Sequence, residues 1–248
     1  MNDLSNSVVV ILAAGKGTRM KSEKAKVLHQ ISHRPMIMYV VETAVQISGK
    51  NVVVVVGSQA KKVQGVVSQS ADVIFAYQEE QKGTGHAVLT ALPVLPDHCQ
   101  NIVILSGDVP LIKAATIKQL IAIHVEQQNE ITILGVKLNE PFGYGRIVIN
   151  KSGEVEKIVE QTDASEAERD INIVNSGMYC VKKNFLKNSL IQITSNNVQN
   201  EIYLTDIVGI ASLQNKKTGL MICHDQTEVM GVNTREDLQN IEALLMES

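Results

Sequence analysis

The chain of 248 residues has no tryptophan, three phenylalanines and five tyrosines, so it offers few rings that stack on nucleic-acid bases or glycans. Neither charge predominates, since 23 lysines and arginines stand against 26 aspartates and glutamates, and this balance argues against nucleic-acid binding. The apolar run near the amino terminus is too short to span a bilayer, and the opening MNDLSNS lacks the basic start of a signal peptide. Three cysteines without metal-binding spacing predict reduced thiols. We therefore expect a cytoplasmic protein without nucleic-acid or membrane partners.

Short apolar runs alternate with amphipathic segments in the first half of the chain. The apolar runs predict strands that are buried on both faces, and the segments between them have helical spacing. The predicted strands are 8–12, 51–57, 73–77, 101–105 and 131–136, and the predicted helices are 36–47, 61–68, 116–127 and one that starts near 85. This alternation predicts an α/β fold with a doubly wound, mostly parallel, Rossmann-like sheet. Ligands of such sheets bind at the carboxyl ends of the strands.

The pattern changes after residue 137. A loop rich in glycine and aromatic residues at 141–147 and a hairpin turn at Gly153-Glu154 precede a strand at 171–181. We expect these segments to form a smaller antiparallel β lobe across the ligand cleft. Residues 200–207 are expected to start a helix, and a strand at 220–223 and an amphipathic helix at 236–246 complete the chain.

The turn at 13–19 follows the first predicted strand and contains Gly15 and Gly17, which allow backbone N–H groups to approach a ligand closely. One arginine and four lysines lie between residues 16 and 26. A flexible backbone beside concentrated positive charge suits an anion with several phosphates. Dinucleotide binding is disfavoured because Met20 stands where a glycine is required, and a P-loop is disfavoured by Val10. Taken alone, the turn also fits a tight strand-to-helix connection without a ligand.

Two further loops after predicted strands carry polar side chains. Gln78 has a donor and an acceptor that match a pyrimidine edge, and Thr84 can contact a ligand or cap the following helix. Asp108 follows the strand 101–105 and suits either a divalent cation such as Mg²⁺ or the capping of a turn. The residues themselves leave both pairs of alternatives open.

Eight motifs together resemble one family, the N-acetylglucosamine-1-phosphate uridylyltransferases among the sugar nucleotidyltransferases. The motifs are LAAGKGTRM at 12–20, KVLH at 26–29, GTGHA at 83–87, GDVPL at 107–111, GYGRI at 143–147, VNSG at 174–177, YLTD at 203–206 and GVN at 231–233. They cover essentially the whole chain, and GTGHA with GYGRI is more specific than the opening loop. The resemblance is to the pyrophosphorylase domain of the bifunctional bacterial enzymes, and it implies a nucleotide-diphospho-sugar transferase fold.

The resemblance also implies roles for individual residues, carried over by position. The implied nucleotide-binding residues are Leu12, Ala13, Ala14, Gly15, Gln78, Gly83 and Thr84. The implied catalytic residues, which grip the triphosphate and neutralise the departing pyrophosphate, are Arg19 and Lys26. The implied ligands of Mg²⁺ are Asp108 and Asn233, and the implied contacts of the N-acetylglucosamine moiety are Gly145, Glu160 and Asn175.

The implied reaction joins UTP and N-acetylglucosamine 1-phosphate to give UDP-N-acetylglucosamine and pyrophosphate, by Mg²⁺-assisted in-line attack on the α-phosphorus. No protein nucleophile is needed, because the sugar phosphate is already an anion. A related transferase that uses glucose 1-phosphate or dTTP remains an alternative. A second alternative, from another class, is a non-catalytic nucleotide-sugar sensor, although intact charged positions argue against it.

Three features depart from the family pattern. Ala25 stands where the family usually has proline, which predicts a looser approach to Lys26, and Ser106 replaces a tyrosine of some relatives. The hexapeptide repeats of the left-handed β-helix domain are missing, so we expect neither acetyltransferase activity nor the trimerising element, and the oligomeric state stays open. We expect one domain over 1–248, with 5–137 mainly nucleotide-binding, 138–232 mainly sugar-binding and 233–248 a C-terminal helix.

Overall fold

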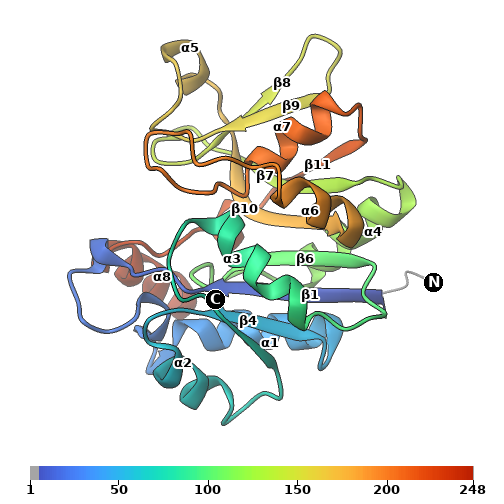
Figure 1. Ribbon diagram of the computed structural model, residues 1–248. Coiled ribbons are helices and arrows are strands. Elements are labelled where there is room, and N and C mark those ends of the chain that lie inside the picture. Colours follow the sequence, from blue (N-terminus) through green and yellow to red (C-terminus); the bar gives the residue numbers. More distant parts are fainter. Residues whose placement is uncertain (1–5, 248) are drawn as a thin grey trace.

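The computed structural model describes residues 6–247 and is built on one sheet of nine strands (Figure 1). The central strands are continuous apolar runs: all five valines of β4 (Val52–Val56) are fully buried, and β1 (Ser7–Ala13) is buried except at Leu12. A strand without polar side chains has no face that favours water, so it requires cover on both sides. The strand positions predicted from apolar runs are confirmed, with shifts of one or two residues at their ends.

The sheet is mostly parallel at its centre and has the order β11-β7-β10-β6-β1-β4-β5. β1 pairs in parallel with β4 and β6, β4 with β5, and β7 with β11, whereas β10 is antiparallel to both β6 and β7. The remaining strands are β5 (Ile74–Tyr77), β6 (Asn101–Ser106), β7 (Ile131–Lys137), β8 (Arg146–Ile149), β9 (Val155–Val159), β10 (Ile173–Lys182) and β11 (Thr218–Cys223). The predicted α/β fold with a mostly parallel sheet is confirmed.

The antiparallel strands are arranged differently from the expectation of a lobe added to the core. β10 lies inside the main sheet, between β6 and β7, so this one strand joins the two halves of the chain. Only the hairpin of β8 and β9 projects, and in Figure 1 it stands with α5 (Glu166–Arg169) at the end of the molecule opposite α2.

Helices cover both faces of the sheet and divide the apolar side chains into two large clusters. One face packs against α1 (Met36–Ser48), α2 (Ala60–Val67) and α4 (Ala114–Glu126), and the other against α3 (Thr84–Ala91), α6 (Lys183–Leu190) and α7 (Asp206–Leu213). The short pair β2 (Gln30–Ile31) and β3 (Arg34–Pro35) packs on α8 (Arg235–Glu247). The one-turn helices are η2 (Thr18–Met20), η3 (Lys26–Leu28), η4 (Leu92–Val94) and η5 (Gln226–Val229).

Two helical expectations were incomplete. The helix expected to start at 200–207 begins only at Asp206, because Ile202 is held by backbone hydrogen bonds to another loop: its N–H donates to the carbonyl of Lys82 (2.7 Å) and its carbonyl accepts from Gly85 (2.8 Å). α6 was not predicted, since its sequence KNFLKNSL is mostly polar. Phe185, Leu186 and Leu190 nevertheless lie on one face of the helix and are buried, and this tertiary contact stabilises a helix of only eight residues.

The parallel strands end together at one edge. Ala13 pairs with Val56, Val56 with Tyr77, and Leu12 with Ser106. The chain passes from β1 to β4 on one side, while β6 lies on the other side of β1. This reversal of strand order leaves a crevice beyond the carboxyl end of β1, where ligands of α/β sheets bind.

A bulge interrupts β10 at the same edge. The register with β7 shifts between Asn175 and Met178, and Gly177 has φ +78° within the bulge. The hydroxyl of Ser176 donates to the carbonyl of Leu134 (2.6 Å), and the amide oxygen of Asn175 accepts from the N–H of Gly177 (3.0 Å). Because a bulge redirects side chains, this one sets the direction of Asn175.

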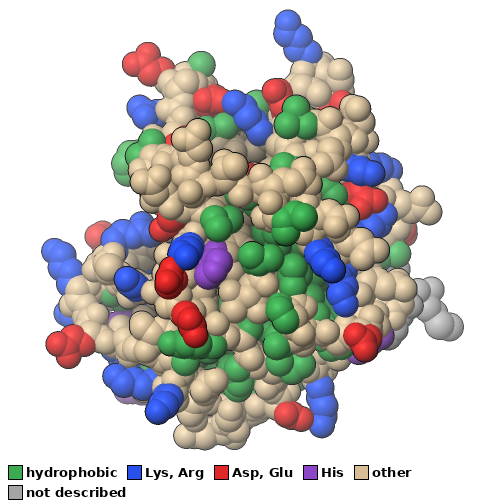
Figure 2. Space-filling model, viewed as in Figure 1, with side chains coloured by type: hydrophobic (Ala, Val, Ile, Leu, Met, Phe, Trp, Pro, Cys, Tyr) green, Lys and Arg blue, Asp and Glu red, His purple; other side chains and the backbone are tan. Residues whose placement is uncertain are grey.

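The surface agrees with the balanced composition. On the face drawn in Figure 2, basic and acidic side chains are intermingled. Among residues 6–247, no helix combines the length and hydropathy that a bilayer-spanning segment requires. Cys99, Cys180 and Cys223 are all free thiols and buried.

A buried histidine in α4 makes stability depend on pH. His124 is 1 % exposed, its Nδ1 lies 2.9 Å from the hydroxyl of Thr132, and burial lowers its pKa to about 4. The unfolded chain binds a proton near pH 6.5, whereas the folded protein does not, so stability is lost as the pH falls from 6.5 towards 4. We expect the free energy of unfolding to fall by about 2–3 kcal/mol more between pH 7.5 and 4.5 in the wild type than in His124→Asn. Denaturant titrations at both pH values measure this difference.

The exposed His98 provides the control, because it has the same side chain in water. His98→Asn should keep the wild-type pH dependence. Equal pH dependence in the wild type and His124→Asn would show that His124 does not contribute.

Candidate active site

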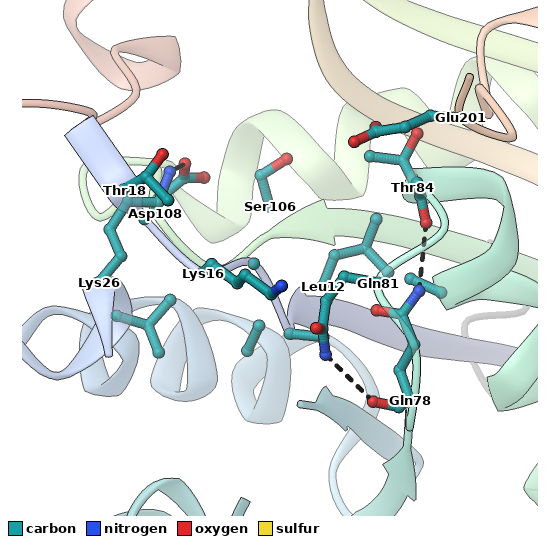
Figure 3. A pocket seen from close by; sticks show the side chains of 17 residues that line it. Leu12, Lys16, Thr18, Lys26, Gln78, Gln81, Thr84, Ser106, Asp108 and Glu201 are labelled. Carbon is teal, nitrogen blue, oxygen red and sulfur yellow. Dashed lines mark hydrogen bonds and ion pairs between the residues drawn. The ribbon is translucent and has the colours of Figure 1, made fainter. Parts of the chain in front are cut away.

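A cavity of about 490 Å³ opens at the carboxyl edge of the parallel strands. Its wall is formed by the turn after β1, by the loop after β5 and by the end of β6. In Figure 3, Lys26 and Asp108 lie on one side, and Gln78, Thr84 and Glu201 on the other. The loops at the strand ends therefore enclose a cavity at the edge where the sequence predicts the ligand site.

The two glycines of the first turn serve different purposes. A Cβ at Gly15 would meet nothing within 4 Å, so the backbone there is open to the cavity. Gly17 has φ +62°, and a Cβ on it would lie 2.5 Å from the Cβ of Lys26. Gly17 thus gives room for Lys26 as well as a left-handed backbone. Ala25 has φ −53°, which is close to the value that proline would impose, so alanine already adopts the backbone conformation expected of the family.

Four charged or polar side chains from distant segments converge beside the cavity. The Nζ of Lys26 forms an ion pair with Asp108 and donates to the Oδ1 of Asn233 (3.1 Å). Arg19 also donates to that oxygen, from Nη2 (2.8 Å). The loop of Asn233 is fastened to that of Asp108, since the N–H of Val232 donates to the Asp108 carbonyl (2.9 Å). The predicted catalytic and metal-binding residues therefore form one cluster.

The oxygens of this cluster suit a hard divalent cation. One ammonium group contacts both Asp108 and Asn233, so the two oxygens lie within reach of a single cation. The Asn233 amide cannot turn its nitrogen towards them, because Arg19 and Lys26 both donate to Oδ1. Among the described residues, no group of three or more His, Cys, Asp or Glu side chains could hold a metal. A site with one carboxylate and one amide leaves positions for phosphate and water, which Mg²⁺ prefers.

The predicted base-reading residues form a second group. Gln78 is 3 % exposed, and its Nε2 donates to the carbonyl of Gly83 (3.2 Å). Gly83 has φ +103°, and a Cβ there would lie 2.6 Å from the carbonyl oxygen of Ile202, so only glycine fits. Thr84 does not cap α3: its hydroxyl accepts instead from the N–H of Leu204 (3.0 Å). The capping interpretation of Thr84 is therefore wrong.

The three residues predicted to contact the sugar form a third group, outside the wall of the main cavity. The N–H of Asn175 donates to the carbonyl of Gly145 (2.9 Å), and a Cβ on Gly145 would lie 3.3 Å from the Oε2 of Glu160. The hydroxyl of Thr205 donates to the other carboxylate oxygen of Glu160 (3.1 Å). Burial raises the pKa of Glu160, while the bond from Thr205 lowers it. Gly145 thus keeps open the approach to a carboxylate that Thr205 orients.

The adjoining loop is held by a buried arginine. Arg146 is 2 % exposed and donates from Nη2 to the amide oxygen of Gln161 (2.8 Å). The same oxygen accepts from the N–H of Gly143 (3.0 Å). Arg146 therefore stabilises the loop next to Gly145 and is not one of the residues that line the cavity.

Sequence reasoning did not assign several residues that line the cavity. They are Thr18, Val27, Gln81, Ala87, Ser106 and Glu201, whereas Lys16 and Gly17 were placed only in the predicted phosphate-binding turn. Glu201 was expected to start a helix, and it reaches the cavity only because its neighbour Ile202 is bound to the loop at 82–85. No local signal marks that contact.

Comparisons with known proteins agree with this architecture. The family model described as nucleotidyl transferase matches residues 8–227. The chain is 45% identical over 239 residues to the bifunctional protein GlmU of Trichlorobacter lovleyi, which covers 96% of this chain and 52% of that protein. It is 40% identical to the bifunctional protein GlmU of Desulfotalea psychrophila over 93% of this chain and 68% of the relative. Thus the chain spans about half the length of several curated relatives that it matches.

A solved structure of UDP-glucose pyrophosphorylase complexed with UDP-glucose superposes with a TM-score of 0.76, covering 97% of this chain and 98% of the other. At 17% identity, this likeness supports the fold alone.

Proposed function

The chain belongs to the nucleotidyl transferase family, and from this premise we propose that it transfers UMP from UTP to N-acetylglucosamine 1-phosphate. The products are UDP-N-acetylglucosamine and pyrophosphate. The observation that carries the proposal is the convergence of Arg19, Lys26 and Asp108 around Asn233, beside a cavity of nucleotide size. The eight family motifs supply the identity of the substrates.

The reaction exchanges one phosphoanhydride for another bond of the same kind. A phosphate oxygen of the sugar phosphate forms a bond to the α-phosphorus of UTP, and the bond from that phosphorus to the bridging oxygen breaks. The electron pair leaves with pyrophosphate, so no protein nucleophile or general base is required. The protein must hold two anions in line and balance the charge that develops.

The cluster around Asn233 can perform that task. Arg19 and Lys26 bring two positive charges to the place where the phosphates would lie, and Lys26 is only 14 % exposed, so its charge is poorly screened by water. Asp108 and Asn233 would hold Mg²⁺, which supplies further positive charge against the phosphate oxygens. The backbone of Leu12 to Gly15 would carry the nucleoside.

The remaining groups would give specificity. Gln78, Gly83 and Thr84 would bind uracil. Glu160, oriented by Thr205, and Asn175, directed by the β10 bulge, would accept or donate hydrogen bonds to the hydroxyl and acetamido groups of the sugar. The proposed partners are therefore UTP and N-acetylglucosamine 1-phosphate, in the cytoplasm.

The decisive experiment measures pyrophosphate release from UTP and Mg²⁺ with three sugar phosphates in parallel. We expect fast release with N-acetylglucosamine 1-phosphate and slow release with glucose 1-phosphate or glucosamine 1-phosphate. Fast release with glucose 1-phosphate alone would keep the chemistry and refute the sugar assignment. Nucleotide binding without release from any sugar phosphate would instead support a sensor.

A further inference from the structure

The side-chain amide of Gln78 has one fixed orientation. Its nitrogen faces the backbone carbonyl of Gly83 (3.2 Å) and the Nδ1 of His86 (3.0 Å). A carbonyl oxygen can only accept, so the atom opposite Gly83 must be the NH₂ group. In Figure 3 this nitrogen points towards the turn of Thr84, and the amide oxygen points away from that turn.

The contact with His86 assigns the tautomer of that ring. The NH₂ group of Gln78 has two hydrogens, and the carbonyl of Gly83 and the Nδ1 of His86 take one each. Nδ1 must then carry a lone pair, so the neutral ring has its proton on Nε2. His86 lies in the first turn of α3, which begins at Thr84 and so fixes the ring beside Gln78.

The oxygen of the same amide is left for a ligand. Gln78 lines the cavity, and no side chain or backbone group among residues 6–247 donates to its Oε1. The N–H groups of Gly83 and Thr84, at the start of α3, likewise have no acceptor within the described residues. The site therefore offers an acceptor next to donors, which complements the N3–H and carbonyl oxygens of uracil.

We propose that His86 is a positioning residue for base selection, which locks the Gln78 amide so that its oxygen faces the base and favours UTP over CTP. Uracil presents N3–H to that oxygen, whereas cytosine in the same place presents a lone pair and is repelled. Thymine has the same edge as uracil, so this contact does not distinguish UTP from dTTP. The inference rests on the proposed function in taking a nucleoside triphosphate as the ligand.

Binding of UTP and CTP to the full chain, measured by calorimetry with Mg²⁺ and without a sugar phosphate, tests the proposal. In His86→Ala the amide keeps only its contact with the Gly83 carbonyl, so its orientation is less restricted, and we expect the preference for UTP over CTP to fall about tenfold, the effect of one hydrogen bond. His86→Asn places an oxygen near the position of Nδ1 and should restore most of the preference. His98→Ala removes an exposed histidine and should change nothing. An unchanged preference in His86→Ala would overturn the proposal.

A second measurement does not depend on any variant. The ¹⁵N NMR signals of His86 in the wild-type protein, assigned by their loss in His86→Asn, should show an unprotonated Nδ1 and a protonated Nε2. The opposite tautomer would refute the proposal. Because neither readout needs turnover, failure of uridylyl transfer can be told apart from failure of base selection.

Discussion

Replacing Asp108 by alanine is expected to lower kcat/KM on the order of 10³- to 10⁴-fold, because a charge-stabilising metal contributes several kcal/mol to phosphoryl transfer. In the structure, Asp108 is the carboxylate of the cluster around Asn233, and it contacts Lys26 directly. Initial rates at increasing Mg²⁺ concentrations measure the effect. We expect the Mg²⁺ concentration that gives half-maximal rate to rise as well, since one of the two proposed protein ligands of Mg²⁺ is lost.

The ion pair with Lys26 provides an alternative role for Asp108, that of orienting the lysine. A double-mutant cycle separates the two roles. If Asp108 only orients Lys26, then Asp108→Ala will have no effect in a Lys26→Ala background. If it binds Mg²⁺, the loss and the higher Mg²⁺ requirement will persist there. Asp97→Ala removes an exposed carboxylate and should behave as the wild type.

Arg19→Ala is expected to lower kcat on the order of 10³-fold, by analogy with arginines that stabilise transferred phosphoryl groups. Arg19 is exposed, and among residues 6–247 its side chain hydrogen-bonds only to the Oδ1 of Asn233 (2.8 Å), so its removal should leave the core and the unfolding temperature unchanged. Single-turnover measurements with saturating UTP report the chemical step. Near-normal turnover in Arg19→Ala would remove this residue from the mechanism.

Arg19→Lys distinguishes charge from geometry. A lysine keeps the positive charge but lacks the planar fork that binds two phosphate oxygens together. We expect it to recover only part of the lost rate. Lys24→Ala, in the same loop but outside the cluster around Asn233, serves as the control and should keep full activity.

Much of the fold could be predicted because it is encoded locally. The valine run of β4 cannot form a half-solvated strand, and α1 and α4 repeat apolar residues at helical spacing, so each element was identified within a few residues. α6 also has apolar residues at helical spacing, Leu186 and Leu190, but it is short and most of its residues are polar. The helix is stabilised because Phe185 and Leu186 pack against apolar side chains of the sheet and its neighbouring helices. These side chains come from distant parts of the chain.

The position of β10 in the sheet could not be predicted from the sequence either. Its apolar pattern fits an edge strand of a lobe and an internal strand equally well. The pairing with β6 and β7 is decided by hydrogen bonds between segments separated by tens of residues. The order of the strands is therefore known only from the folded sheet.

Some features of the candidate site could likewise be predicted from the sequence, and others could not. The sequence alone determined an α/β chain with buried parallel strands and a glycine-rich turn beside lysines and an arginine, because these features follow from side-chain polarity and backbone freedom over a few residues. Only the tertiary structure decided that Lys26 contacts both Asp108 and Asn233, that Glu201 reaches the cavity, and that His86 fixes the amide of Gln78. The physical reason is that hydrogen bonds and ion pairs act over about 3 Å. Only the folded sheet brings residues as far apart as Lys26 and Asn233 within that distance.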